Sequence, residues 1–168
     1  MELIVVHYAE NLEFKLSKIE IENCPIFPRI KPKGGVWTSP IRSKYGWDKW
    51  CKSNNYGSID KLTKVEMVIE YVNNKNLIVI DDEKDLDKLI WESDPMIKHF
   101  FEETGFKAPF GEFIDFEKMR KKGVDAIWLT EKGERRTRFI YPRNLYGWDC
   151  ETILILNERC VKSWRYMK

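Results

Sequence analysis

Three polar residues that could take part in chemistry stand beside apolar segments far apart in this sequence. Glu151 comes directly before the apolar run 152–156, His7 lies within the apolar stretch 3–9, and Ser39 follows a Gly-Gly pair and a short strand-like segment. A carboxylate avoids the rim of a core unless it is solvated, paired or used in chemistry. An imidazole donates or accepts hydrogen bonds, and a hydroxyl can orient a carboxylate. The three types suit a polar site, provided that the fold brings their segments together.

The elements that must position these residues are predicted from apolar periodicity and from capping residues. We expect strands at 3–9, 36–38, 64–72, 76–80, 124–130 and from 152 onward, and helices at 43–51, from Asp81 or Asp82 through Ile90, from Asp94 to Gly105, and at 113–122. The two strands at 64–72 and 76–80 flank a polar turn, Asn73-Asn74-Lys75, which predicts a hairpin. Gly34-Gly35 permits a backbone with positive φ before the strand that Pro40 stops. The basic segment after residue 130 is expected to be hairpin-like.

The order of strands, then helices, then strands predicts an α+β fold with a mainly antiparallel sheet. At 168 residues the chain is expected to form one domain, 1–168. There is no GxGxxG after the first strand and no Walker loop, which disfavours Rossmann and P-loop folds.

Composition excludes several classes of protein. An apolar content of 43% and an aromatic content of 14% exclude global disorder, and a net charge of +2 does not by itself indicate a nucleic-acid or membrane partner. The four cysteines form no CxxC pair and only two histidines are present, which supports neither a zinc site nor a disulfide framework, so no metal is expected. No apolar run is long enough to cross a bilayer and no secretory signal precedes the first strand, so we expect no membrane association and a cytoplasmic location.

Three short motifs resemble those of the ADP-ribosyltransferase superfamily, which has one branch with diphtheria toxin and the poly-ADP-ribose polymerases and another with a Ser-Thr-Ser motif. "VVHYA" looks like the first motif, with His7 as the matching residue, and "VWTSP" is similar to the second, with Ser39 at the last serine of the Ser-Thr-Ser form. "DCETILIL" looks like the third, with Glu151 matching the catalytic glutamate. Two departures are the tryptophan Trp37 in the second motif and Asp-x-Glu, from Asp149 to Glu151, where relatives carry Glu-x-Glu or Gln-x-Glu. The motifs do not assign the chain to one branch.

The resemblance implies a split β-sheet with flanking helices and NAD as the substrate. Glu151 and His7 would be catalytic, and the residues expected to bind the cofactor are His7, Tyr8, Trp37, Thr38, Ser39, Tyr45 and Trp47. Breaking the nicotinamide glycosidic bond builds positive charge on the ribose, as in glycoside hydrolysis, and a fixed carboxylate stabilises that charge. Ser39 would orient this carboxylate, and Trp37, Tyr45 or Trp47 would stack on the nicotinamide. The acceptor of ADP-ribose would be a protein, a nucleic acid, a small molecule or water, and candidates on its side are Asp149, Arg135, Arg136 and Arg138.

Other interpretations stay open. The first is an ADP-ribosyltransferase or NAD glycohydrolase, such as a small toxin, effector or phage-type modifier of a host target. The second is the same fold acting as a nucleotide- or protein-binding module without turnover. The third is a nucleic-acid-binding module that uses the basic-aromatic segment 118–143. Each motif residue also has a structural explanation: a histidine at a strand end is often satisfied locally, Ser39 before Pro40 can make a turn, and Trp47 and Trp50 suit a buried helix face.

Overall fold

A computed structural model of the chain describes residues 2–10, 16, 19–24, 30–71, 76–93, 99, 102–105 and 112–167. The described elements are, in chain order, β1 (Glu2–Ala9), β2 (Ile21–Glu22), β3 (Lys33–Gly34), β4 (Val36–Pro40), α1 (Trp47–Ser53), the 3-10 helix η1 (Ile59–Lys61), β5 (Thr63–Glu70), β6 (Leu77–Ile80), the 3-10 helix η2 (Glu83–Lys88), β7 (Trp91–Ser93), β8 (Glu112–Ile114), α3 (Phe116–Lys121), β9 (Ala126–Leu129), α4 (Glu131–Thr137), β10 (Thr152–Ile155), the 3-10 helix η3 (Glu158–Cys160) and β11 (Val161–Tyr166).

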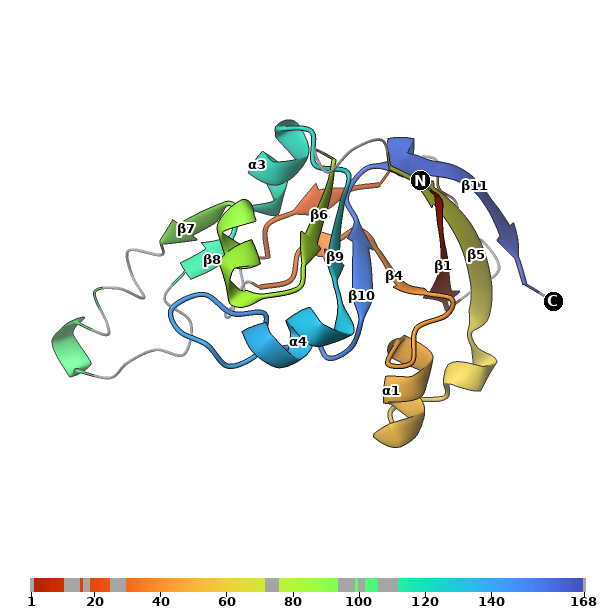
Figure 1. The fold of residues 1–168 in the computed structure, drawn as a ribbon, viewed down its shortest axis with the longest axis horizontal. Helices are drawn as coiled ribbons and strands as arrows, with labels where there is room; N and C mark the ends of the chain where they lie inside the picture. The colour runs from red at the N-terminus through yellow and green to blue at the C-terminus, as the bar shows by residue number, and fades with distance from the viewer. Residues whose placement is uncertain are drawn as a thin grey trace.

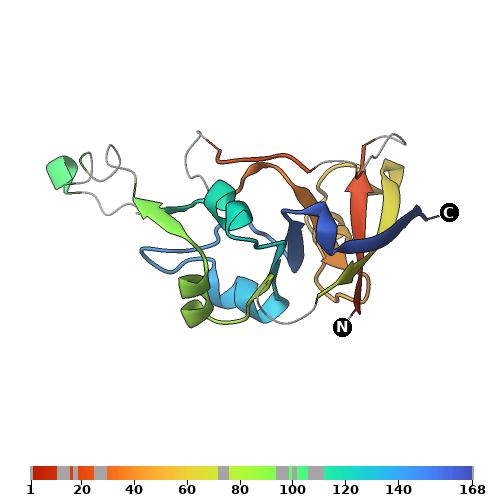
Figure 2. The ribbon, with the colours of Figure 1, turned by 90° about the horizontal axis from the view of Figure 1, so that it is seen from above.

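The fold is α+β, as predicted, and a curled seven-stranded sheet dominates it (Figure 1). The strand order is β11-β5-β1-β4-β10-β9-β6, and every neighbouring pair is antiparallel except β6 and β9. The short helices α1 and α4 lie along the lower side of the sheet in Figure 1. From above, β11 and the N-terminus lie at one end of the molecule and β7 lies toward the other (Figure 2).

The β1–β4 ladder is short. Strand β1 pairs with β5 through eight residue pairs, but with β4 through three, from Val5↔Pro40 to His7↔Thr38, as β4 does with β10. Beyond His7 and Thr38 the strands β1 and β4 have no further ladder pairs. This join has β11, β5 and β1 on one side, which we call one half of the sheet, and β4, β10, β9 and β6 on the other.

Buried apolar side chains occupy both halves of the sheet. Fully buried members include Val5, Val65, Met67, Ile127, Leu129, Ile153 and Leu154, with Phe116 and Met119 from α3. The β-branched and aliphatic runs of β1, β5, β9 and β10 form strands because such side chains pack well on a pleated, half-buried surface. Burying them supplies most of the driving force for the fold.

The two glycines before β4 have the conformation that the sequence predicts. Gly34 and Gly35 have φ of 85° and 75°. A Cβ on Gly34 would lie 2.2 Å from the carbonyl oxygen of Glu20, and one on Gly35 would lie 2.7 Å from Leu154 Cδ1. Only glycine fits both the backbone angles and this close approach, which brings the chain into β4 against β10.

Several local predictions are confirmed within a few residues. Strands occur at the N-terminus, after the Gly-Gly pair, near 126 and from 152. The predicted helix at 43–51 begins only at Trp47, with Gly46 as its N-cap, and the predicted helix after Asp82 is the 3-10 helix η2. Most of the predicted helix from Asp94 to Gly105, and the predicted turn at Asn73-Asn74-Lys75, lie outside the described residues.

Two predictions are wrong. Strands β5 and β6 do not form a hairpin: β5 lies between β1 and β11, whereas β6 pairs in parallel with β9 at the opposite edge. The basic segment after residue 130 begins as the helix α4 and not as a hairpin. Thr130 caps α4 by accepting a hydrogen bond from the Gly133 amide, and Glu131 pairs with Arg135 one turn later, which are both helix-forming contacts.

Candidate functional site: a cavity where β1 and β4 diverge

A cavity of about 340 Å³ opens where β1 and β4 diverge, and we call it the β1–β4 cavity. It is lined by Val6, His7, Tyr8, Lys31, Trp37, Thr38, Ser39, Trp47, Gly147, Trp148, Asp149, Cys150 and Thr152. Three consecutive residues of β1 and three of β4 line it, although successive side chains of a strand point to opposite faces. The cavity therefore lies between the strands, where their ladder ends. Its volume is at the lower end of the range for small-molecule sites.

Most of the residues predicted to bind a cofactor line this cavity. They are His7, Tyr8, Trp37, Thr38, Ser39 and Trp47, and the predicted acceptor-side residue Asp149 joins them. These residues come from four segments of the chain that the tertiary structure brings together. Tyr45 is not among the lining residues, and its carbonyl oxygen instead accepts a hydrogen bond from the Glu151 amide at 2.9 Å.

His7 closes the end of the β1–β4 ladder. Its Nδ1 atom lies 2.8 Å from the carbonyl oxygen of Trp37, and because a carbonyl can only accept, Nδ1 carries the proton. Burial lowers the pKa of His7, and the hydrogen bond to Trp37 opposes this effect only in part. The imidazole is therefore held in its neutral form at neutral pH.

Ser39 joins the N-terminus of α1 to the start of β10. Its hydroxyl donates to the carbonyl oxygen of Glu151 at 3.0 Å and accepts from the amide of Trp47 at 2.9 Å. A Cβ on Gly46 would lie 3.0 Å from Ser39 Cβ, so the glycine before α1 allows this close approach. The expectation that Ser39 orients the carboxylate of Glu151 is corrected here, because Ser39 bonds only backbone groups at this position.

The carboxylate of Glu151 is held by two other side chains. The hydroxyl of Ser43 donates to Oε2 at 2.6 Å, and the indole of Trp128 donates to Oε1 at 3.1 Å. Glu151 is half-buried and is not among the residues that line the β1–β4 cavity, although its neighbours Cys150 and Thr152 are. Ser43 and Trp128 thus fix the carboxylate outside the cavity lining, directly before the first residue of β10.

Aromatic side chains form two walls of the cavity. The rings of Trp37 and Trp148 meet edge to face with centroids 4.8 Å apart, and the indole of Trp148 donates to the Ile30 carbonyl at 2.7 Å. On the α1 side, Trp47 stacks on Trp50 with centroids 5.1 Å apart. Among the three aromatic residues predicted to stack on a ligand ring, Trp37 and Trp47 line the cavity.

The other ionisable groups of the cavity are not activated nucleophiles. Burial raises the pKa of the Cys150 thiol to about 11, and its sulfur lies 3.3 Å from the Thr152 hydroxyl. Burial, with the nearby Asp48 and Cys51, raises the pKa of Tyr8 to about 12. Both groups therefore stay protonated at neutral pH and offer neutral donors to a ligand.

Asp149 is held by an arginine from α4. Arg138 donates to Asp149 at 2.7 Å and to the buried Glu134 at 2.6 Å, so one guanidinium links the cavity wall to the helix. Burial opposes the charge on Arg138, but the hydrogen bond to Glu134 and the charge of Asp149 outweigh it and raise the pKa of Arg138. Arg138 is therefore a positioning residue for Asp149.

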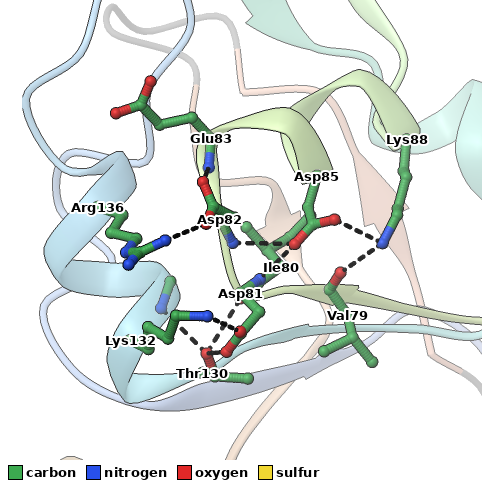
Figure 3. Close-up of polar contacts among 11 residues, drawn as sticks. Val79, Ile80, Asp81, Asp82, Glu83, Asp85, Lys88, Thr130, Lys132 and Arg136 are labelled. Carbon is green, nitrogen blue, oxygen red and sulfur yellow. Dashed lines mark hydrogen bonds and ion pairs between the residues drawn. The ribbon is translucent and has the colours of Figure 1, made fainter.

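Of the two remaining arginines predicted on the acceptor side, Arg136 belongs to a network between η2 and α4, which we call the η2–α4 network (Figure 3). It consists of Asp81, Asp82, Asp85, Lys88, Thr130, Lys132 and Arg136. Arg136 pairs with Asp82, Lys132 pairs with Asp81, and Arg135 pairs with Glu131 on its own helix. Because acidic groups of the chain neutralise these cations, segment 118–143 presents less free positive charge than its sequence indicates.

Sequence reasoning missed four residues of the site: Lys31, Ser43, Trp128 and Trp148. Ser43 and Trp128 lie 108 and 23 residues from Glu151, and no periodicity links them to it. Lys31 stands in a stretch with Pro32 and Gly34 that reads as irregular loop. Only the packing of separate segments reveals these contacts.

Comparisons with known proteins do not identify the chain: no family model, curated protein or solved structure gives a significant match. Within the described part of the chain, no helix has the length and the apolar character needed to cross a bilayer. No group of three or more His, Cys, Asp or Glu side chains is arranged to hold a metal ion in those same residues.

Proposed function

We propose that this protein is an ADP-ribosyltransferase-like enzyme that binds NAD in the β1–β4 cavity and breaks the bond between nicotinamide and ribose. The observation that carries the proposal is the convergence of His7, the 37–39 motif and the segment of Glu151 on one cavity, from positions more than 100 residues apart. Aromatic walls for a flat ring and neutral donors for ribose hydroxyls fit this ligand. At about 340 Å³ the cavity suits one half of a dinucleotide, with the other half outside.

The proposed reaction is a substitution at the ribose carbon C1′. The glycosidic bond to the nicotinamide nitrogen breaks, its electron pair goes to that nitrogen, and neutral nicotinamide leaves. A nucleophile of the acceptor donates its electron pair to C1′ and loses a proton. Positive charge grows on the ribose between these events, and the carboxylate of Glu151, held by Ser43 and Trp128, would stabilise it.

A second candidate is favoured by the placement of Glu151. Because Ser43 and Trp128 occupy its carboxylate oxygens and the side chain does not line the cavity, the same site could bind NAD without turnover. The protein would then be a nucleotide-binding module.

The two candidates are separated by measuring nicotinamide release and NAD binding on the same samples, with and without cell lysate as a source of acceptor. Glu151→Gln keeps the size of the side chain but removes the charge; its one amide oxygen can still accept from the Trp128 indole, and its NH2 group can donate to the Ser43 hydroxyl. We expect the substitution to reduce nicotinamide release by about 100-fold or more, the loss typical of removing one stabilising group from a transition state, while NAD binding changes little.

Glu131→Gln is the matched control, because Glu131 is a carboxylate of α4 that pairs with Arg135 outside the cavity. This control should release nicotinamide as fast as the wild type. Equal release by wild type and Glu151→Gln would remove Glu151 from the mechanism. Binding without release would establish the second candidate, and absence of binding would overturn both.

A further inference from the structure

Lys31 is the cation that lines the β1–β4 cavity, and it lies against the aromatic wall. Its Nζ atom lies 5.5 Å from the centroid of the Trp37 ring, in a cation–π arrangement. A Cβ on Gly147 would lie 3.8 Å from Lys31 Cε, so the lysine stem passes close to this glycine. The carbonyl of the preceding residue, Ile30, accepts the hydrogen bond from Trp148. The ammonium is therefore directed by the aromatic wall.

Lys31 differs from the basic residues of α4 in its partners. Among the described residues, no carboxylate lies within 4 Å of its ammonium, whereas Lys132, Arg135, Arg136 and Arg138 are each paired with an acid. Although much of the residue is exposed, burial of the ammonium lowers the pKa of Lys31, and the charge of Asp149 opposes this effect. An anionic group that enters the cavity would meet a cation that has no ion pair within the part of the chain that the structure describes.

Lys31 is the cation among the described residues that line the cavity, and it lies at Trp37. Trp47 belongs to the wall formed by α1, and the Ser39 hydroxyl bridges its amide to the backbone carbonyl of Glu151, whose carboxylate is not part of the lining. A positively charged pyridinium ring is repelled by an ammonium, and a phosphate is attracted by it.

We propose that Lys31 binds the phosphate of the ligand and thereby orients it, with the phosphate at Trp37 and the nicotinamide ring against the wall that contains Trp47. The inference rests on the proposed function and adds the group of the ligand that the cavity recognises, its phosphate. It also assigns a specificity-determining residue that the motifs do not contain.

The test compares the affinities of three probes: nicotinamide riboside, which has no phosphate, nicotinamide mononucleotide, which has one, and NAD. Each is titrated calorimetrically into wild type, Lys31→Met and Lys33→Met. Methionine keeps most of the lysine stem and its packing but removes the charge. Lys33 is the matched control, because it is an exposed lysine two residues away that pairs with Glu22.

We expect the wild type to bind the two phosphate-bearing probes more tightly than the riboside. Lys31→Met should weaken binding of the mononucleotide and of NAD by about 10- to 100-fold, the usual contribution of a hydrogen bond between charged groups. It should leave riboside binding unchanged, and Lys33→Met should behave as wild type. Raising the salt concentration should weaken mononucleotide binding in the wild type and not in Lys31→Met, because only the wild type keeps the ionic contact.

Two results would overturn the inference while the proposed function stands. One is wild-type protein that binds the riboside as tightly as the mononucleotide. The other is an equal loss for all three probes in Lys31→Met, with an unchanged near-ultraviolet circular dichroism spectrum, which would make Lys31 a part of the aromatic wall only. If wild-type protein binds none of the probes, the proposed function fails as well.

Discussion

The β1–β4 cavity and the η2–α4 network are both rich in polar side chains, and they differ in what satisfies those side chains. In the network, Asp85 accepts hydrogen bonds from the amides of Asp81 and Asp82 and pairs with Lys88 (Figure 3). In the cavity, Lys31 has no such acid within reach among the described residues. Charges that the chain pairs with one another stabilise its structure, and charges that it leaves beside a cavity can meet a ligand.

The pairing of charges within the network is reflected in the lowered pKa values of its aspartates. The hydrogen bond from Lys132, and next that from Thr130, lowers the pKa of Asp81. Burial of Asp85 opposes its ionisation, but Lys88 and the amides of Asp81 and Asp82 outweigh that effect and lower its pKa. A dense acidic segment such as 81–87 is therefore a cap and a set of ion pairs, although its composition alone suggests a binding site.

The largest expected loss of folding stability comes from truncating a tryptophan in the aromatic wall of the cavity. Trp148 is 1% exposed, packs against Trp37 and donates to Ile30. We expect Trp148→Ala to lower the free energy of unfolding by about 3–5 kcal/mol, the usual cost of truncating a buried tryptophan, as measured by urea denaturation. Trp164, which is 38% exposed on β11, is the control position, and Trp164→Ala should cost clearly less. Equal losses would mean that Trp148 does not support the cavity.

An intermediate loss of folding stability is expected from a substitution in the η2–α4 network. Asp85→Ala removes the acceptor for two amides at the start of η2 and the partner of Lys88. The free energy of unfolding should fall by about 1–2 kcal/mol, as for the loss of a helix cap. Asp87→Ala on the same 3-10 helix removes an exposed carboxylate that pairs with Arg143, and should cost at most about 1 kcal/mol. NAD binding should survive both changes, and its loss in Asp85→Ala would contradict the separation of the two regions.

The smallest effect is a difference in pH dependence. The pKa of His7 is lowered by burial, so the unfolded chain binds more protons than the folded one below about pH 6.5. Stability that is present above this pH is therefore lost as the pH falls toward the folded-state pKa. For Asp81 and Asp85, whose folded pKa values are also lowered, the loss begins only below their unfolded value of 3.8. The cavity and the network should respond in two separate pH windows.

The measurement is the free energy of unfolding at pH 7.5 and pH 5 for wild type, His7→Gln and His99→Gln. Wild type should lose more stability between these two pH values than His7→Gln does. His99 is the only other histidine of the chain and its side chain is 71% exposed, so His99→Gln should keep the wild-type loss. A loss of equal size in His7→Gln would assign the effect to groups outside the cavity.

The site was partly predictable from the sequence because its motifs stand at the ends of strands. The apolar, β-branched runs around His7, Ser39 and Glu151 predicted strands that are observed, and six of the predicted cofactor-binding residues line one cavity. The side chains that hold Glu151 were not predictable. Ser43 and Trp128 lie on another loop and another strand, and no local sequence pattern predicts a contact between residues so far apart in the chain.

By itself, the sequence determined where most of the sheet strands form, because apolar periodicity acts over a few residues. It also determined which residue types stand at the strand ends. Only the tertiary structure decided which strands are neighbours. The apolar pattern of a strand shows which of its faces is buried, but it does not show which other strand or helix packs beside it. Thus β5 and β6, adjacent in the chain, lie on opposite sides of the sheet. The same packing of distant segments neutralises the cations of α4 and leaves Lys31 beside a cavity, and neither arrangement can be deduced from the positions of the charges in the sequence.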